Sequence, residues 1–265
     1  MSSWEITKEI KEDLILNRPV LIEGLPGIGN VGKIAVDFLI EELKAKKVCS
    51  FFSHKFPPSV FVGEDNLIDM PKIELYYKKF NGKKPDILLL TGDIQPIDEE
   101  SCYSFCEEII KIFKHYHCTE LITTGGIGLQ NIPDKPRVFC TANDKRLFKE
   151  YSKKELLVEK EIFGVVGPII GVSGILLGLG QKRHIKGVAL LAETFGHPMY
   201  LGIKGAKELL RVINQKMKCN LDLKKMNKEI IEVEKQLLKK NKILTSEHGH
   251  PAGAKREDSE INYIG

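Results

Sequence analysis

The sequence lacks a long uninterrupted apolar stretch. No run reaches the roughly 18 consecutive apolar residues of a membrane-spanning helix, although 42% of the 265 residues are hydrophobic. The first residues, Met1 to Glu5, also lack the charged and then apolar pattern of a secretory signal peptide. We therefore expect a soluble, cytoplasmic protein with no membrane partner.

The cysteines lack the spacing of a disulfide framework, which indicates free thiols in a reducing compartment. A metal site is an alternative, because Cys102 and Cys106 are four residues apart on a predicted helix and His115, His117 and Cys118 follow. These residues lack zinc-finger spacing, so we predict buried thiols and no metal. The six cysteines are Cys49, Cys102, Cys106, Cys118, Cys140 and Cys219.

The sequence also lacks an excess of charge of one sign. It has 40 basic and 36 acidic side chains, a net charge of +4, and its lysines are spread over many segments. A nucleic-acid-binding domain usually gathers its basic residues into one patch or stripe. We therefore predict no nucleic-acid partner.

A glycine-rich turn, Gly24 to Lys33, lies between an apolar strand ending at Glu23 and a helical pattern from Val31. Gly27, Gly29 and Gly32 have dinucleotide-binding spacing, but the next strand is followed by Ser-His-Lys and no acid that would bind a ribose. Read as a phosphate-binding loop, the turn has Lys33 but Ile34 where Mg²⁺ needs a hydroxyl. We interpret the glycines as permitting a tight crossover and predict no cofactor. Nucleotide binding by Gly27, Gly29, Gly32 and Lys33 remains the alternative.

Apolar strands alternate with helical segments along the chain. This order predicts an α/β domain over residues 1–219, with a mainly parallel central sheet flanked by helices. Asn81-Gly82 predicts a hairpin turn, Asp98 the start of a helix, and Gly125 to Gly128 a turn that ends a strand. The predicted strands are Val48–Phe52, Val60–Val62, Lys72–Tyr77, Ile87–Leu90, Leu121–Thr124, Arg137–Thr141 and Val188–Leu191.

Ser173 lies in a sequence that partly matches a hydrolase nucleophile turn. That motif needs glycine two residues after the serine, where this chain has Ile175. The nearest histidine in sequence, His184, lies in a basic turn typical of solvated side chains. We therefore predict no catalytic residues.

Four ordered segments together resemble the archaeal proteasome assembly chaperone family: Leu21–Gly32, Thr91–Pro96, Thr124–Gly128 and Leu191–Thr194. The resemblance implies a fold similar to nucleoside phosphorylases without their catalytic residues. It also implies a homo-oligomer that guides α-subunits of the 20S proteasome into rings, and leaves open whether a homologous second protein joins it. The family is also linked to ATP-dependent ligases, so a nucleotide-binding enzyme stays the alternative function.

The apolar pattern of residues 220–244 predicts a long helix. Its apolar residues recur at separations of three and four and form one seam, Leu223, Met226, Ile230, Val233 and Leu237. Such a seam packs either on a partner helix or on the parent domain. Both options stay open.

Residues 245–265 predict a disordered tail with a docking peptide at its end. No large apolar residue occurs from Thr245 to Glu260, and apolar side chains return in Ile261, Tyr263 and Ile264 before Gly265. This end resembles the hydrophobic-tyrosine-any motif of proteasome activators, with the tyrosine one place earlier, so that either Tyr263 or Ile264 fills the pocket. The expected function is that of a non-enzymatic proteasome assembly chaperone or adaptor.

Overall fold

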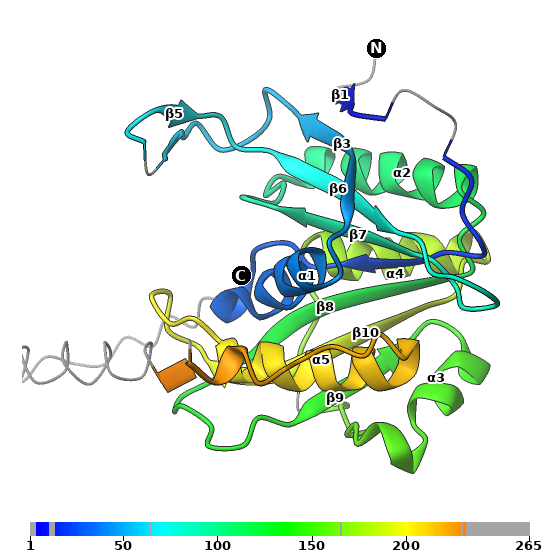
Figure 1. Cartoon of the computed structure of the whole chain (residues 1–265). Helices are drawn as coiled ribbons and strands as arrows, with labels where there is room; N and C mark the ends of the chain where they lie inside the picture. The colour runs from blue at the N-terminus through cyan, green and yellow to red at the C-terminus, as the bar shows by residue number, and fades with distance from the viewer. Residues whose placement is uncertain (1–3, 11–13, 64, 165, 229, 232–265) are drawn as a thin grey trace, which may run out of the picture.

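The computed structural model describes residues 4–10, 14–63, 65–164, 166–228 and 230–231, and Figure 1 shows the arrangement of their elements. One 8-stranded sheet runs through the molecule. In order across this sheet, its strands are β1 (Glu5–Lys8), β3 (Lys46–Phe52), β6 (Ile73–Lys78), β7 (Ile87–Gly92), β2 (Val20–Glu23), β8 (Glu120–Leu129), β10 (Gly187–Phe195) and β9 (Val138–Ala142). A separate 2-stranded hairpin contains β4 (Phe61–Val62) and β5 (Ile68–Asp69).

The centre of the sheet is parallel and its flanks are antiparallel. Strands β7, β2, β8 and β10 run in one direction, whereas β9 on one side and β6 on the other are antiparallel to their neighbours. The β6–β7 hairpin turns at Asn81-Gly82 as predicted, with Gly82 at φ 79°. The predicted α/β class with a parallel core is confirmed.

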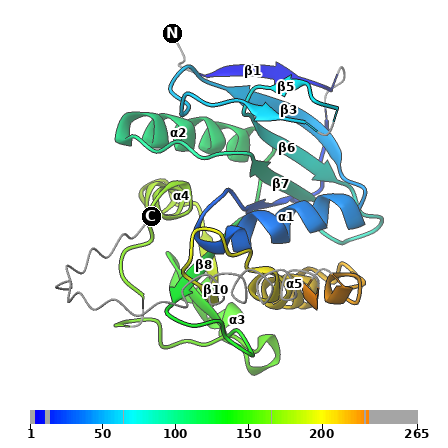
Figure 2. The same ribbon diagram turned by 90° about the vertical axis from the view of Figure 1, so that its left-hand side faces the viewer.

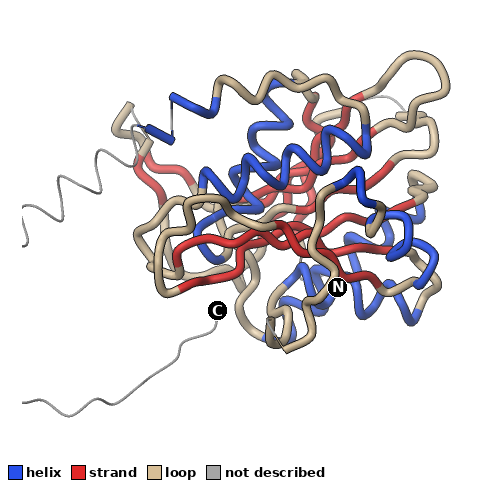
Figure 3. The backbone as a smooth tube through the Cα atoms, turned by 90° about the horizontal axis from the view of Figure 1, so that it is seen from below, coloured by secondary structure: helices blue, strands red, loops and turns tan. Residues whose placement is uncertain are grey.

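Helices cover both faces of the sheet, as Figures 2 and 3 show. Helices α1 and α5 contact each other on one face, and α2 and α4 contact each other on the opposite face. The helices are α1 (Val31–Glu42), α2 (Glu99–His115), α3 (Lys145–Tyr151), α4 (Val172–Lys182) and α5 (Ile203–Met217), with short 3₁₀ turns η1 (Ile28–Asn30) and η2 (Lys154–Leu156). Within the described ranges, no helix is both long and apolar enough to cross a bilayer.

Local sequence explains where the helices begin. The carboxylate of Asp98 accepts a hydrogen bond from the Ser101 backbone N–H at 2.9 Å, and Asp144 caps α3 in the same way through Leu147. Glu99 and Glu100 add negative charge in the first turn of α2, where the helix dipole favours it. The predicted helix start at Asp98 is confirmed.

The hydrophobic core has one layer on each side of the sheet, because the central strands are buried on both faces. Every residue of β2 and of β7 is buried, as expected for parallel strands between two helical layers. Phe105 of α2 lies in one layer and Leu209 of α5 in the other.

The predicted turn at Gly125 to Gly128 is wrong. Strand β8 continues through these glycines to Leu129, because β10 pairs with it residue by residue as far as Phe195. A side chain at Gly126 would overlap the backbone carbonyl of Ile28. The glycines therefore let η1 lie directly on the strand.

Candidate functional site

The glycine-rich turn after β2 lies in close contact with the neighbouring strand β8. A Cβ atom on Gly32 would lie 2.5 Å from the Thr124 carbonyl oxygen of β8, and Gly29 has a left-handed φ of 61°. By contrast, a Cβ atom on Gly27 would meet no other group within 4 Å. Gly29 and Gly32 are therefore required by the crossover from β2 to α1, which favours the architectural interpretation of this turn.

The Lys33 side chain lies along helix α1 and forms an ion pair within it. Its ammonium group donates to Asp37 Oδ2 at 2.8 Å, and the other oxygen of Asp37 accepts from the Thr91 hydroxyl at 2.6 Å. The Gly29 carbonyl accepts from the Gly202 N–H at 2.8 Å. These internal partners give no support to the alternative in which Gly27, Gly29, Gly32 and Lys33 hold a phosphate.

Glu23 is a buried acid to which the sequence pattern assigns no role. Its carboxylate accepts from the Ser173 hydroxyl at 2.8 Å and from the Leu25 N–H at 3.0 Å. Burial raises the pKa of Glu23 to about 7, against the lowering effect of these hydrogen bonds. Ser173 therefore bonds to an acid and anchors the start of α4 to the end of β2. The one signal in the sequence was an acid closing an apolar strand.

Gln95 completes this polar network. Its amide nitrogen donates to the Pro26 carbonyl at 2.6 Å, and its oxygen accepts from the Val172 N–H at 3.3 Å. Gln95 thus joins the loop after β7 to the loop after β2 and to the first residue of α4. The network holds three segments together at the carboxyl edge of the sheet, the edge where the parallel strands end.

A second buried acid at this edge, Glu193, is paired with Arg137. Its carboxylate accepts from the Arg137 backbone N–H at 2.9 Å and from the guanidinium Nε at 2.9 Å. Burial acts to raise the pKa of Glu193, but the hydrogen bonds and charge of Arg137 hold it below the ordinary value. The pair fixes the start of β9 against the end of β10.

The feature that stands out at the carboxyl edge is an apolar arm, residues 57–63 and 65–71. It contains the β4–β5 hairpin and enters β6 at Ile73, opposite Gly92 at the end of β7. Figure 1 shows the arm projecting beyond the sheet. Its exposed large apolar side chains, each between 43% and 71% accessible, are Val60, Phe61, Val62, Leu67, Ile68 and Met70.

Loops at the same edge expose further apolar residues. The loop side chains are Ile97, Ile132, Phe163, Ile170, Met199 and Leu201. Exposed apolar clusters of this kind mark protein–protein interaction sites in soluble proteins. We call the arm and these six residues the apolar edge. Its chemistry suits binding of another protein surface.

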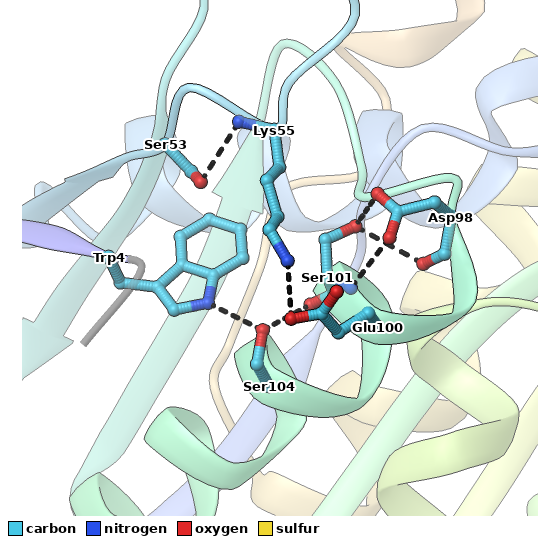
Figure 4. Close-up of polar contacts among 7 residues, drawn as sticks. All are labelled: Trp4, Ser53, Lys55, Asp98, Glu100, Ser101 and Ser104. Atoms are coloured by element: carbon cyan, nitrogen blue, oxygen red, sulfur yellow. Dashed lines mark hydrogen bonds and ion pairs between the residues drawn. The ribbon is translucent and has the colours of Figure 1, made fainter. Parts of the chain in front are cut away.

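The root of the arm is fixed to α2, as Figure 4 shows. Lys55 pairs with Glu100 at 2.6 Å, and the Trp4 indole N–H donates to the Ser104 hydroxyl at 3.0 Å. The buried ring of Phe56 lies edge-on to Trp4 at 5.5 Å. The arm therefore projects from a packed and hydrogen-bonded base.

The structure places part of the predicted helix seam on the body of the protein. Met226 is fully buried in the core layer beneath α1 and α5, and Leu223 and Ile230 pack against it. Val233 and Leu237 lie outside the described residues, as do the predicted docking residues Ile261, Tyr263, Ile264 and Gly265.

The cysteine pair considered for a metal lies in the hydrophobic core. Cys102 and Cys106 are on the buried face of α2, and the Cys106 thiol approaches the Val172 carbonyl at 3.8 Å. His115 and His117 are exposed. No cluster of three or more metal-ligating side chains occurs in the described part of the chain.

Comparison with known proteins agrees with this architecture. Residues 21–240 match the model of the PAC2 family. The uncharacterized protein MJ1210 of Methanocaldococcus jannaschii is 30% identical, with 98% of this chain and 97% of that protein covered.

Two structures from Pyrococcus furiosus are also similar. PbaB, described as an archaeal proteasome activator, is 30% identical with a TM-score of 0.82, and the match covers 91% of this chain and 100% of PbaB. PbaA, described as an archaeal homolog of proteasome-assembly chaperone, is 25% identical with a TM-score of 0.72, covering 92% and 94% of the two chains. With its sequence matched over most of its length and its fold shared, this chain belongs to the PAC2 family.

Proposed function

We propose that this protein is a non-enzymatic proteasome assembly chaperone or activator. In this proposal, the α/β bodies form a homo-oligomer through the apolar edge, and the C-terminal tails bind α-subunits of the 20S proteasome. The observation that carries the proposal is the similarity to the activator PbaB over 91% of the chain, combined with an apolar edge suited to another protein.

The apolar edge supports the homo-oligomer. Six large apolar side chains of the arm face solvent in the isolated chain, and burying them in an interface is favourable by about 25 cal/mol per Å² of apolar surface. In a symmetric oligomer, copies of the same chain would bury this apolar surface against one another. Such an oligomer also places several tails on one particle, which raises their combined affinity for a multi-subunit target.

Binding to purified 20S proteasome tests the tail. We expect the full chain to bind, and a chain ending at Glu260 to lose at least about tenfold in affinity because it lacks the apolar residues and their carboxylate. Tyr263→Ala should weaken binding and Asn262→Ala should not, which controls for changes near the terminus. Equal binding by the full and shortened chains would exclude the tail from the function.

Calorimetry with ATP and Mg²⁺ tests the alternative function. We expect no heat of binding, because Lys33 is paired with Asp37. Micromolar binding that Lys33→Ala abolishes would favour a nucleotide-using enzyme.

A further inference from the structure

A groove of about 490 Å³ lies outside the apolar edge, between the start of β9, the turn η2 and helix α5. Val138, Leu156 and Val212 are buried residues that line it. Leu157 and Leu223 add further apolar surface. This volume is in the range of sites that bind small ligands.

Basic side chains also line the groove. Arg211 pairs with Glu208 at 2.7 Å in an exposed contact, and Arg137 is held by Glu193. Lys135 has no ion pair among the described residues. Glu159, Glu208, Asn214 and Gln215 line the groove as well, so its wall is mixed. The apolar side chains beside Lys135 fit a short apolar peptide that ends in a carboxylate.

Leu157 is the most unusual residue of the groove. Its side chain is 82% exposed, and its backbone is left-handed at φ 54°. A leucine rarely adopts this conformation, because its Cβ atom makes the left-handed region strained. A large apolar side chain is therefore held in solvent beside an apolar groove, where an added peptide would cover it.

The chain itself leads past this groove. After α5 the chain reverses and runs back along this helix. The Leu221 N–H donates to Asn214 at 3.1 Å and Lys207 bonds to Asn227, so these contacts hold residues 221–227 beside α5. Leu223 then contributes to the groove wall. The 29 residues of segment 232–260 separate the last described residue from Ile261. The part of it predicted to be a flexible linker, residues 245–260, would span about 22 Å, and Leu223, eight residues before Ile231, is itself a groove residue.

We infer that this groove binds the C-terminal residues Ile261 to Gly265 of the same chain and keeps them from the proteasome until a proteasome pocket competes. The inference rests on the proposed function in taking these residues as a docking peptide. The apolar side chains would lie against Leu157 and Leu223, and the terminal carboxylate would face Lys135 and Arg211.

A weak contact is sufficient for this control. A tethered peptide experiences an effective concentration of about 1 mM, so an intrinsic dissociation constant of about 0.1 mM would leave roughly one tail in ten free. Weakening the groove should then raise the apparent affinity for 20S by up to about tenfold.

Release of the C-terminal residues by carboxypeptidase tests the inference on the full chain, without any proteasome. Leu157→Ser and Arg211→Glu both change exposed side chains, so the fold should persist, which circular dichroism checks. We expect each variant to lose residues about ten times faster than the parent chain. Ile15→Ser is the matched control, because Ile15 is 80% exposed and is not a groove residue.

Faster release from both groove variants, unchanged at different protein concentrations and accompanied by tighter 20S binding, supports the inference. Release at the parental rate from Leu157→Ser and Arg211→Glu overturns it, even if the tail binds 20S. Protection that disappears on dilution also overturns it, because the tail then occupies another copy. If both groove variants release the C-terminal residues faster but the parent chain does not bind 20S, the proposed function is refuted and binding in the groove stays supported.

Discussion

At the scale of single residues, Glu23 shows how a buried acid is held at the end of a strand. Its carboxylate is shielded from water and bonded to Ser173 and Leu25. Burial outweighs these bonds, so its pKa rises to about 7 from an ordinary value of 4.5. The folded protein therefore keeps a proton on Glu23 over a range in which the unfolded chain has lost it.

This raised pKa has a defined effect on stability. Between about pH 4.5 and pH 7 the folded state binds more protons, so the free energy of unfolding falls as pH rises, by about 3 kcal/mol from this group. In Glu23→Gln this part of the decline should vanish, because an amide does not titrate. Urea unfolding of both proteins at pH 5 and pH 8 measures the difference; parallel pH profiles would contradict the account.

The glycines of the crossover give a second test at this scale. Gly32→Ala should lower the free energy of unfolding by roughly 2–4 kcal/mol, because its Cβ atom would lie 2.5 Å from the Thr124 oxygen and α1 must move away from β8. Gly27→Ala is the matched control and should change it by less than about 1 kcal/mol, since that position is open. Equal losses from both variants in chemical denaturation would argue against packing as the role of Gly32.

At the scale of elements, the arm carries the apolar surface that the proposed oligomer would bury. Val62 and Ile68 are paired across the β4–β5 hairpin and are among its most exposed side chains. The double variant Val62→Ser and Ile68→Ser should reduce the oligomeric mass measured by light scattering, because the apolar surface of the interface is lost. Its thermal stability as a folded chain should change little.

The control for the arm is Ile15→Ser, which changes an equally exposed apolar residue elsewhere in the protein. It should leave the molar mass unaltered. An arm variant with the parental mass would exclude the hairpin from subunit contacts.

Strands and helices with strong periodicity were predictable from the sequence, whereas contacts between distant segments were not. Asp98 marked the start of α2 and Asn81-Gly82 the β6–β7 turn, because both signals act locally. Gly125 to Gly128 misled as a turn, since pairing with β10 outweighs the low strand propensity of glycine. Gln95 carried no local signal at all: its partners, Pro26 and Val172, come from other parts of the chain.

At the scale of the whole molecule, the structure combines a closely packed sheet and its helices with an exposed apolar edge. Helices on both faces of the sheet bury its central strands, while apolar side chains at one edge remain exposed. The alternation of strands and helices predicted this α/β class, and the similarity to PbaB confirms it. The family resemblance is confirmed by the PAC2 match. The exposed arm was hidden in the sequence, because a short hairpin of Val, Phe and Ile reads like any buried strand pair.

The central claim is that an oligomer of these bodies engages the 20S proteasome through its C-terminal residues. Native mass spectrometry of the full chain mixed with 20S proteasome tests it most directly, because it counts the bound copies. The account predicts a complex of 20S with several copies of the chain, and its loss when the chain ends at Glu260. Monomeric protein with no 20S complex, or the same complex from the shortened chain, would contradict it.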